Sequence, residues 1–165
     1  AHFMKRIISF TALLLLLLIP AAAPGAGDFL EDAGIKFFMP DAWETGSSNL
    51  GIMFTSPSGD MILSVGAMPA GQLGDALAMA GERVEQVMTG VEYEEGEREL
   101  EINDFSGMAF SPWGKTENGD AFANFIVLSG ENDHQILIFS MGEADAWENN
   151  EEDIQIFSES LLPTD

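Results

Sequence analysis

The sequence predicts an α+β fold: a central, mostly antiparallel sheet of about six to seven strands with two amphipathic helices packed on it, in the order βββ-α-ββββ-α. Several short segments alternate apolar and polar residues between turn residues, which is the period of a strand. Two longer segments place apolar residues three and four apart, which is the period of a helix. Because most predicted strands are joined by short turns, we expect antiparallel pairing with the helices covering the sheet.

The first three predicted strands are 34–40, 52–56 and 61–68. Pro40 ends the first strand because proline has no N–H to donate to a sheet ladder. The sequence Ser-Pro-Ser-Gly-Asp at 56–60 is rich in turn residues and joins the next two strands into a hairpin.

Two helices are predicted, at 72–89 and at 144–162. The apolar stripe of the first contains Leu73, Leu77, Ala80, Val84, Val87 and Met88, and that of the second contains Trp147, Ile154, Phe157 and Leu161. Gly90 is placed to cap the C-terminus of the first helix. Asp145 and Glu148 resemble a capping pair at the start of the second.

Four strands are predicted between the helices, at 93–102, 105–113 with a continuation around 113–116, 121–129 and 134–141. The dipeptide Asn118-Gly119 favours a hairpin, since both residues readily take positive φ. The last two strands are apolar on both faces, as expected of central strands covered on both sides.

Residues 4–25 are predicted to be a signal peptide. A Lys-Arg pair precedes 13 apolar residues at 7–19, and a stretch of Ala, Pro and Gly follows. The apolar run is too short for a membrane span, which takes about 20 residues. Residues 1–3, before the first Met, are interpreted as a cloning remnant. We therefore expect 26–165 to be a single domain outside the cytoplasm, periplasmic or secreted, with no stable membrane anchor after cleavage.

The predicted domain is strongly acidic. Without Lys5 and Arg6, 28 acidic residues face four basic ones, a net charge of −24. The four basic residues are Lys36, Arg83, Arg98 and Lys115. Such a surface repels phosphate backbones and anionic headgroups, so we expect no nucleic-acid or membrane-surface binding. It suits cations, basic partners or a salty environment. The chain has no Cys, which excludes disulfides and thiolate sites.

Six residues carry a pattern shared with a known superfamily: Ile35, Phe37, Pro40, Trp43, Asn103 and Gly107. The first four form a hook, G-I-x-F-x-x-P-x-x-W, and the other two lie in the turn I-N-D-F-S-G. The last predicted helix adds I-x-x-F-x-x-S-L. The chain thereby resembles the PsbP-like fold superfamily over about residues 30–163. This group includes the extrinsic photosystem II protein and exported bacterial proteins related to DcrB. The resemblance implies a domain that binds other proteins or has no assigned role, without a catalytic motif.

Two tryptophans are considered as contacts for a ligand or partner. Trp43 follows Pro40 and is interpreted as a large apolar residue that folds back onto the core. The alternative is that Trp43 stacks on a ligand. Trp113 is the second candidate for such a contact.

No catalytic residue is predicted. His134 is the only histidine after residue 28, so a Ser-His-Asp triad would depend on it. However, the sequence has no G-x-S-x-G elbow, and His134 opens a strand after a polar turn. There is also no glycine-rich phosphate loop or dinucleotide fingerprint. We expect a non-enzymatic protein without a cofactor, apart from a possible Ca²⁺ ion.

The candidate metal ligands are Glu97, Glu99 and Glu101, which alternate along one strand. Their side chains would lie about 7 Å apart at each step, so they could hold Ca²⁺ only loosely. Alternatively, they form a solvated sheet edge that resists pairing with another chain.

Two functional hypotheses follow. In the first, the protein is an exported, non-enzymatic interaction module that binds an unknown protein through a concave sheet face or the groove beside a helix. In the second, it binds a small ligand or a divalent cation outside the cytoplasm.

Overall fold

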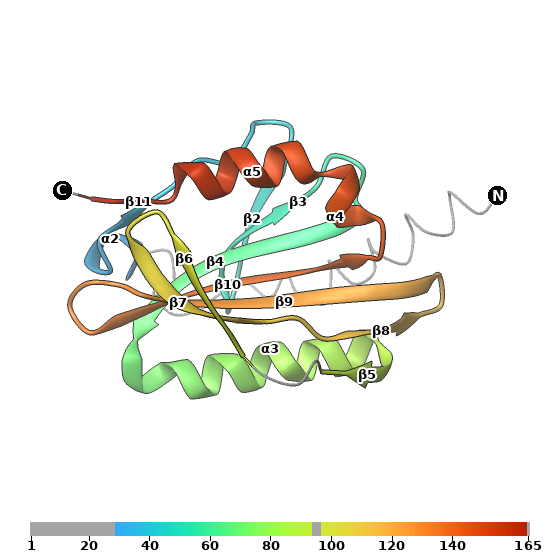
Figure 1. Ribbon diagram of the computed structural model, residues 1–165. Helices are drawn as coiled ribbons and strands as arrows, with labels where there is room; N and C mark the ends of the chain where they lie inside the picture. Colours follow the sequence, from blue (N-terminus) through green and yellow to red (C-terminus); the bar gives the residue numbers. More distant parts are fainter. Residues whose placement is uncertain (1–28, 94–96, 165) are drawn as a thin grey trace.

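A nine-stranded antiparallel sheet forms the centre of the computed structural model, which describes residues 29–93 and 97–164 (Figure 1). Its main path is β2 (Glu44–Ser48), β3 (Gly51–Thr55), β4 (Met61–Pro69), β10 (His134–Glu143), β9 (Gly119–Ser129), β7 (Phe105–Phe110) and β6 (Arg98–Ile102). Beyond the end of β7, β8 (Trp113–Thr116) pairs with β9, and β5 (Thr89–Glu92) pairs with β8. The predicted α+β fold is confirmed.

The helices lie on opposite faces of this sheet (Figure 1). One face carries α3 (Leu73–Val87), which follows the short 3₁₀ turn η2 (Ala70–Gln72). The other carries α4 (Ala146–Asn149) and α5 (Glu151–Ser160). Near the first described residues, α2 (Phe29–Asp32) precedes a small two-stranded sheet. Within the described residues, no helix is long and apolar enough to cross a bilayer. The predicted signal peptide lies outside the described residues.

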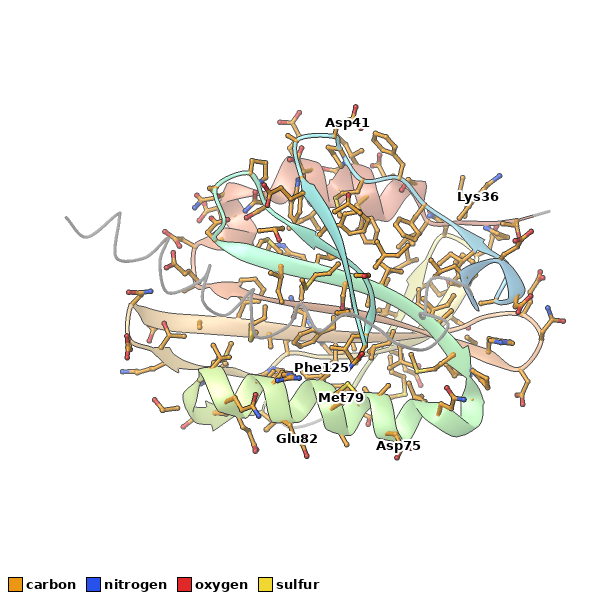
Figure 2. All side chains as sticks on the ribbon, turned by 180° about the vertical axis from the view of Figure 1, so that it is seen from behind. Lys36, Asp41, Asp75, Met79, Glu82 and Phe125 are labelled. Carbon is orange, nitrogen blue, oxygen red and sulfur yellow. The ribbon has the colours of Figure 1, made fainter. Side chains whose placement is uncertain are left out.

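Alternation along the central strands divides the apolar residues into two cores. On β4, Met61 and Leu63 face the α5 side, while Ile62 between them packs on the α3 side. Figure 2 shows Phe125 of β9 between the sheet and α3, whereas Asp75 and Glu82 of α3 point away from the sheet. The central strands are therefore covered on both sides, as their apolar sequence predicts.

The first predicted strand, 34–40, is much shorter than expected. Only β1 (Ile35–Lys36) is extended and paired, with β11 (Leu162–Pro163) as its partner outside the main sheet. At Phe38 the backbone N–H donates to Oγ of Ser160 at 2.8 Å, and the one proton of that hydroxyl faces the carbonyls of Phe38 at 3.0 Å and Phe157 at 2.6 Å. These side-chain hydrogen bonds replace a ladder at this point.

The end of the first helix also differs from the prediction. α3 ends at Val87, and Met88 is already extended, with φ −108° and ψ 144°. Gly90 takes φ +61° within β5 and does not cap the helix. The chain thus begins an edge strand at Thr89, several residues before the predicted start at Tyr93.

The second predicted helix, 144–162, is interrupted at Asn150. The buried Asn150 side chain donates to the Ala146 carbonyl at 2.7 Å and to Oδ1 of Asp60 at 3.0 Å. Asn side chains that bond nearby backbone compete with regular helix in this way. The result is a separate four-residue helix, α4, before α5 begins at Glu151.

Asp60 connects the β3–β4 turn to this interruption. Its Oδ1 accepts hydrogen bonds from the hydroxyls of Ser56 at 2.6 Å and Ser58 at 2.7 Å, besides the one from Asn150. Asn149 donates to Oδ2 at 3.4 Å. Partial burial by itself would raise the pKa of Asp60, but these hydrogen bonds to the ionised form outweigh it and hold the pKa below its ordinary value. We call this group the Asp60 clamp.

The hook residues pack where β1, β3 and α5 meet. Ile35 is buried, and Phe37 makes edge-to-face contacts with Phe54 and Phe157 at centroid distances of 6.0 and 5.6 Å. The backbone N–H of Trp43 donates to the Pro40 carbonyl at 3.1 Å, which turns the chain back after Pro40.

The other two motif residues act through the backbone. Asn103 has φ +53°, and its amide Nδ2 donates to the carbonyls of Ser158 and Leu161 at the end of α5. Gly107 of β7 lies so close to the carbonyl of Val127 that a Cβ atom would overlap that oxygen. The motif therefore has a structural role at both places.

Candidate functional site: a groove on the open half of the sheet

The sheet face that carries α4 and α5 is covered only in part (Figure 1). Trp147 of α4 marks the boundary, because its ring meets Phe122 of β9 edge-to-face at 5.8 Å. Beyond this contact, Ser111, Asn124 and Ile126 on the same face are only half-buried. Side chains of β9 and of the connection between β7 and β8 therefore remain open to solvent beside a short helix.

Strand register places these side chains in rows. Trp113 lies opposite Phe122 on β9 and opposite Glu92 on β5. Arg98 lies opposite Ala109, which in turn lies opposite Ile126. Because directly paired residues project to the same face, all of them point toward the side that carries α4.

Two adjoining hollows lie over these rows. The first has a volume of about 640 Å³ and contains Arg98 and Ser111; the second, of about 590 Å³, contains Trp113 and Gly114. Both are bordered by Phe122 and Ala144, so the two hollows adjoin at these residues. We call the two together the sheet groove and define it by Arg98, Leu100, Ser111, Trp113, Gly114, Phe122, Asn124, Ile126, Ala144 and Trp147.

One end of the sheet groove is polar. Nη2 of Arg98 donates to Oγ of Ser111 at 2.8 Å, and the Ser111 hydroxyl donates to Oδ1 of Asn124. Among the described residues, no carboxylate forms an ion pair with Arg98. The guanidinium is thus held in place by neutral groups on the floor of the groove.

The other end is aromatic. Trp113 is 47 % exposed and Trp147 is 36 % exposed, and both border the half-buried Phe122. Nε1 of Trp113 donates to Oε2 of Glu92 at 3.0 Å, which fixes the indole at the rim. Large aromatics that expose an apolar face beside a polar group are common at protein interfaces.

The two tryptophan candidates have different surroundings. Trp113 lies in the sheet groove. Trp43 is only 3 % exposed and belongs to the core on the α5 side, where Nε1 donates to Oδ2 of Asp153 at 2.9 Å. It packs as the structural interpretation expects, and its ring offers no free face to a ligand or partner.

The candidate metal ligands lie on the exposed surface of the sheet edge. Glu99 and Glu101 are exposed on β6, opposite Met108 and Ser106 of β7, and Glu97 precedes the strand. Leu100 and Ile102, which alternate with these glutamates, pack against the core, so the predicted alternation is correct. No three His, Asp or Glu side chains converge on a possible metal position within 29–93 and 97–164.

His134 is not part of the sheet groove. It opens β10 opposite Pro69, and its Nδ1 lies 2.8 Å from the Asn132 carbonyl. A carbonyl only accepts, so Nδ1 carries the proton in this arrangement.

Sequence reasoning missed Arg98, Phe122 and Trp147 as groove residues. The sequence pattern places Trp147 in the apolar stripe of the second helix. In the structure, the break at Asn150 puts Trp147 on α4, at the edge of the sheet face that the helices cover. The signal that was available is the scarcity of basic residues: two of the four after residue 28, Arg98 and Lys115, border the two hollows.

Comparisons with known proteins bear on the fold. No protein-family model and no curated protein sequence matches the chain. The solution structure of the cyanobacterial PsbP (CyanoP) from Synechocystis sp. PCC 6803 is similar, with a TM-score of 0.52 and 12 % identity over 80 % of this chain and 88 % of that chain. The crystal structure of LpqN, which is involved in cell envelope biogenesis of Mycobacterium tuberculosis, gives a TM-score of 0.50 and 10 % identity over 87 % of this chain and 100 % of that chain. The chain therefore has a PsbP-like fold, as its motif residues predict.

Proposed function

We propose that this chain is an extracytoplasmic, non-enzymatic interaction module that docks a partner protein in the sheet groove. The observation that carries the proposal is the pair of exposed rings, Trp113 and Trp147, on either side of the half-buried Phe122. Tryptophans at the centre of a patch provide much of the binding energy in many protein interfaces. A ring exposed on an open sheet face loses contact with water when a partner covers it, which favours association.

The location outside the cytoplasm rests on two observations. The segment 4–25 has the charge, length and small-residue pattern of a signal peptide. LpqN, which shares the fold, is involved in cell envelope biogenesis. The net charge of −24 after cleavage agrees with a soluble protein that avoids nucleic acids and anionic membranes.

A small apolar ligand is the second candidate function. The lining of the hollow beside Trp113 includes four small residues, Gly90, Gly114, Ala121 and Ala144, and three charged ones, Glu92, Lys115 and Asp120. At about 590 Å³ it falls within the size range of small-molecule sites. A partner side chain would use the same space.

Site-specific photo-cross-linking tests the proposal. Benzoylphenylalanine is placed at Trp113 in one variant and at Trp147 in another, and both are irradiated with the extracytoplasmic fraction of the producing cells. The control position is Glu82, which points away from the sheet on α3 (Figure 2). We expect the same protein adduct from both groove positions and none from Glu82. Adducts of equal yield from Glu82, or none from the groove in repeated trials, would contradict the proposal.

A further inference from the structure

We infer that the partner enters the sheet groove as an extended segment that places an apolar side chain beside Trp113 and a carboxylate on Arg98. The inference rests on the proposed function and names the chemistry of its partner. It concerns one acidic side chain in a mainly apolar segment, not a polyanion.

The state of Arg98 carries the first part of the argument. Among the residues that the structure describes, its side chain has a single hydrogen-bond partner, the neutral Ser111 at 2.8 Å. A guanidinium has five N–H donors in a planar fork that matches a carboxylate in two parallel bonds. The hydrogen bond to Ser111 uses one of these donors, so among the described residues the other N–H groups of Arg98 have no hydrogen-bond partner and can face an incoming carboxylate.

Neutral groups hold this arginine in position. The Ser111 hydroxyl in turn donates a hydrogen bond to Oδ1 of Asn124, so the series Arg98–Ser111–Asn124 links β6, the connection between β7 and β8, and β9. A guanidinium that is already oriented loses less side-chain entropy when it binds a carboxylate. Its neutral partners also leave its full positive charge to the incoming group.

The aromatic end provides space for an apolar side chain. Gly114 lines this hollow, and a Cβ atom there would lie 3.1 Å from Cβ of Met88 and from the Thr89 carbonyl. Glycine thus allows β5 and β8 to approach closely at the floor of the hollow. The exposed ring of Trp113 and the edge of Phe122 supply apolar walls above it.

The spacing of the two ends defines the partner segment. Arg98 is paired with Ala109, and Trp113 is paired with Phe122. The distance between the two ends of the groove is therefore the distance from position 109 to position 113, which is four residues. At the rise of a strand this is roughly 13 Å. An extended segment with its apolar and acidic residues four positions apart reaches both ends, because its side chains at even spacing project to one side.

The acidic surroundings restrict the partner to few charges. Glu92, Glu99 and Asp120 border the two hollows and outnumber the one further cation there, Lys115, so they repel additional carboxylates. At physiological salt the Debye length is about 8 Å, so distant acids are screened while contacts within the groove are not. One carboxylate that meets Arg98 directly is therefore favoured, and a run of acids is disfavoured.

A selection from a displayed library of random peptides tests the inference. The protein is immobilised, and enriched peptides are sequenced and then measured one by one by fluorescence anisotropy. We expect enriched sequences to share an Asp or Glu four positions from a large apolar residue. Replacing that acid by its amide should weaken binding to the wild type about tenfold, as for loss of a charge-assisted pair.

The matched variants are Arg98→Gln and Lys36→Gln, which remove the same charge. Arg98→Gln should bind the acid and amide peptides equally, about tenfold more weakly than the wild type binds the acid peptide. Lys36 lies on β1 and does not line either hollow, so Lys36→Gln should behave as the wild type. Unchanged melting temperatures would show that both variants are folded.

Two contrary results have different meanings. Peptides that lose binding in Trp113→Ala but show no preference for an acid would overturn the carboxylate inference and leave the proposed function standing. If no enriched peptide depends on Trp113 or on Trp147, the groove does not bind extended segments, and both the inference and the proposed function fail.

Discussion

The indole N–H of Trp43 donates a hydrogen bond to Oδ2 of Asp153 at 2.9 Å, which joins the hook after β1 to the first turn of α5. The two residues are 110 positions apart in the chain. The same indole is buried in the core on the α5 side. One side chain thus combines core packing with a polar link at a helix start, where an acidic residue is also favoured by the helix dipole.

Trp43→Ala should destabilise the protein by about 3–5 kcal/mol, because it removes a large buried ring and leaves a cavity. Trp43→Phe keeps part of the packing and loses the hydrogen bond, so we expect a loss of about 1–2 kcal/mol. Urea denaturation followed by circular dichroism measures both. Equal losses in the two variants would mean that the hydrogen bond, not the ring volume, is the main contribution.

The Asp60 clamp predicts a pH dependence of stability. Because the folded-state pKa of Asp60 lies below its ordinary value of 3.8, its stabilising effect is present above that value. The effect is lost as the pH falls through the lower, folded-state pKa. The melting temperature should therefore fall in acid with a contribution that Asp60→Asn removes.

The measurement is a series of thermal melts of the wild type and Asp60→Asn from neutral pH to below 3.8. Asp41→Asn, an exposed aspartate on the loop before Trp43, is the matched control for the loss of one charge (Figure 2). We expect the wild-type and Asp60→Asn curves to converge in acid. Curves that stay parallel throughout would show that the clamp does not depend on ionisation.

Asn103 combines a left-handed backbone with hydrogen bonds to the end of α5, and two substitutions separate these effects. Asn103→Gly keeps the backbone conformation and loses the hydrogen bonds, so we expect a loss of about 0.5–1.5 kcal/mol. Asn103→Ala also strains the backbone and should lose about 1 kcal/mol more. Chemical denaturation provides the values. A glycine variant as stable as the wild type would assign the whole effect to the backbone.

Gly107→Ala should be severely destabilising, because the added methyl group would overlap the backbone carbonyl of Val127 on the paired strand. Overpacking of this kind typically costs about 1–3 kcal/mol, and rigid strand backbone places it at the upper end. The matched control is Gly81→Ala on α3, where no atom lies within 4 Å of the new Cβ. Gly81→Ala should stabilise the helix by about 0.5–1 kcal/mol. Differential scanning calorimetry on both variants checks the opposite signs.

Calcium should stabilise the protein no more than magnesium at the same ionic strength. Glu99 and Glu101 alternate along β6, and no third ligand converges on them among the described residues. Screening of the acidic surface raises the melting temperature similarly for both ions. A specific site would raise it further as the concentration of free Ca²⁺ increases. A rise specific to Ca²⁺ that disappears in the Glu99→Gln, Glu101→Gln double variant would instead favour cation binding.

The sequence predicts the central fold well because the core strands and the helix α3 have clear patterns of apolar residues. The β9–β10 pair is apolar on both faces, and its hairpin partners are close in the chain. The helix α3 has one continuous apolar stripe, and this stripe predicts that the helix covers one face of the sheet. Local patterns were sufficient here because tertiary packing agrees with them.

Other elements had no local signal. β2 reads Glu-Thr-Gly-Ser-Ser and forms an edge strand only through its pairing with β3. The break at Asn150 depends on Asp60, which is 90 positions away. The sheet groove combines Arg98, Phe122 and Trp147 from three separate elements, and only the folded register brings them together. Contacts between distant segments determine these features, and periodicity does not encode them.

The separation of α4 from α5 has a mechanical consequence for the groove. Trp147 stands on a four-residue helix whose last residue, Asn149, and following residue, Asn150, are both tied to Asp60. The rim of the groove is therefore fastened to the β3–β4 turn, on the far side of α4 from the open face. Replacing the turn at 56–60 with a shorter loop would leave every groove residue in the sequence. It would remove Asp60, however, and with it the hydrogen bonds to Asn149 and Asn150 that hold α4 and Trp147 in place. A shorter loop at that turn would thus change the rim of the sheet groove, although the turn itself does not line the groove.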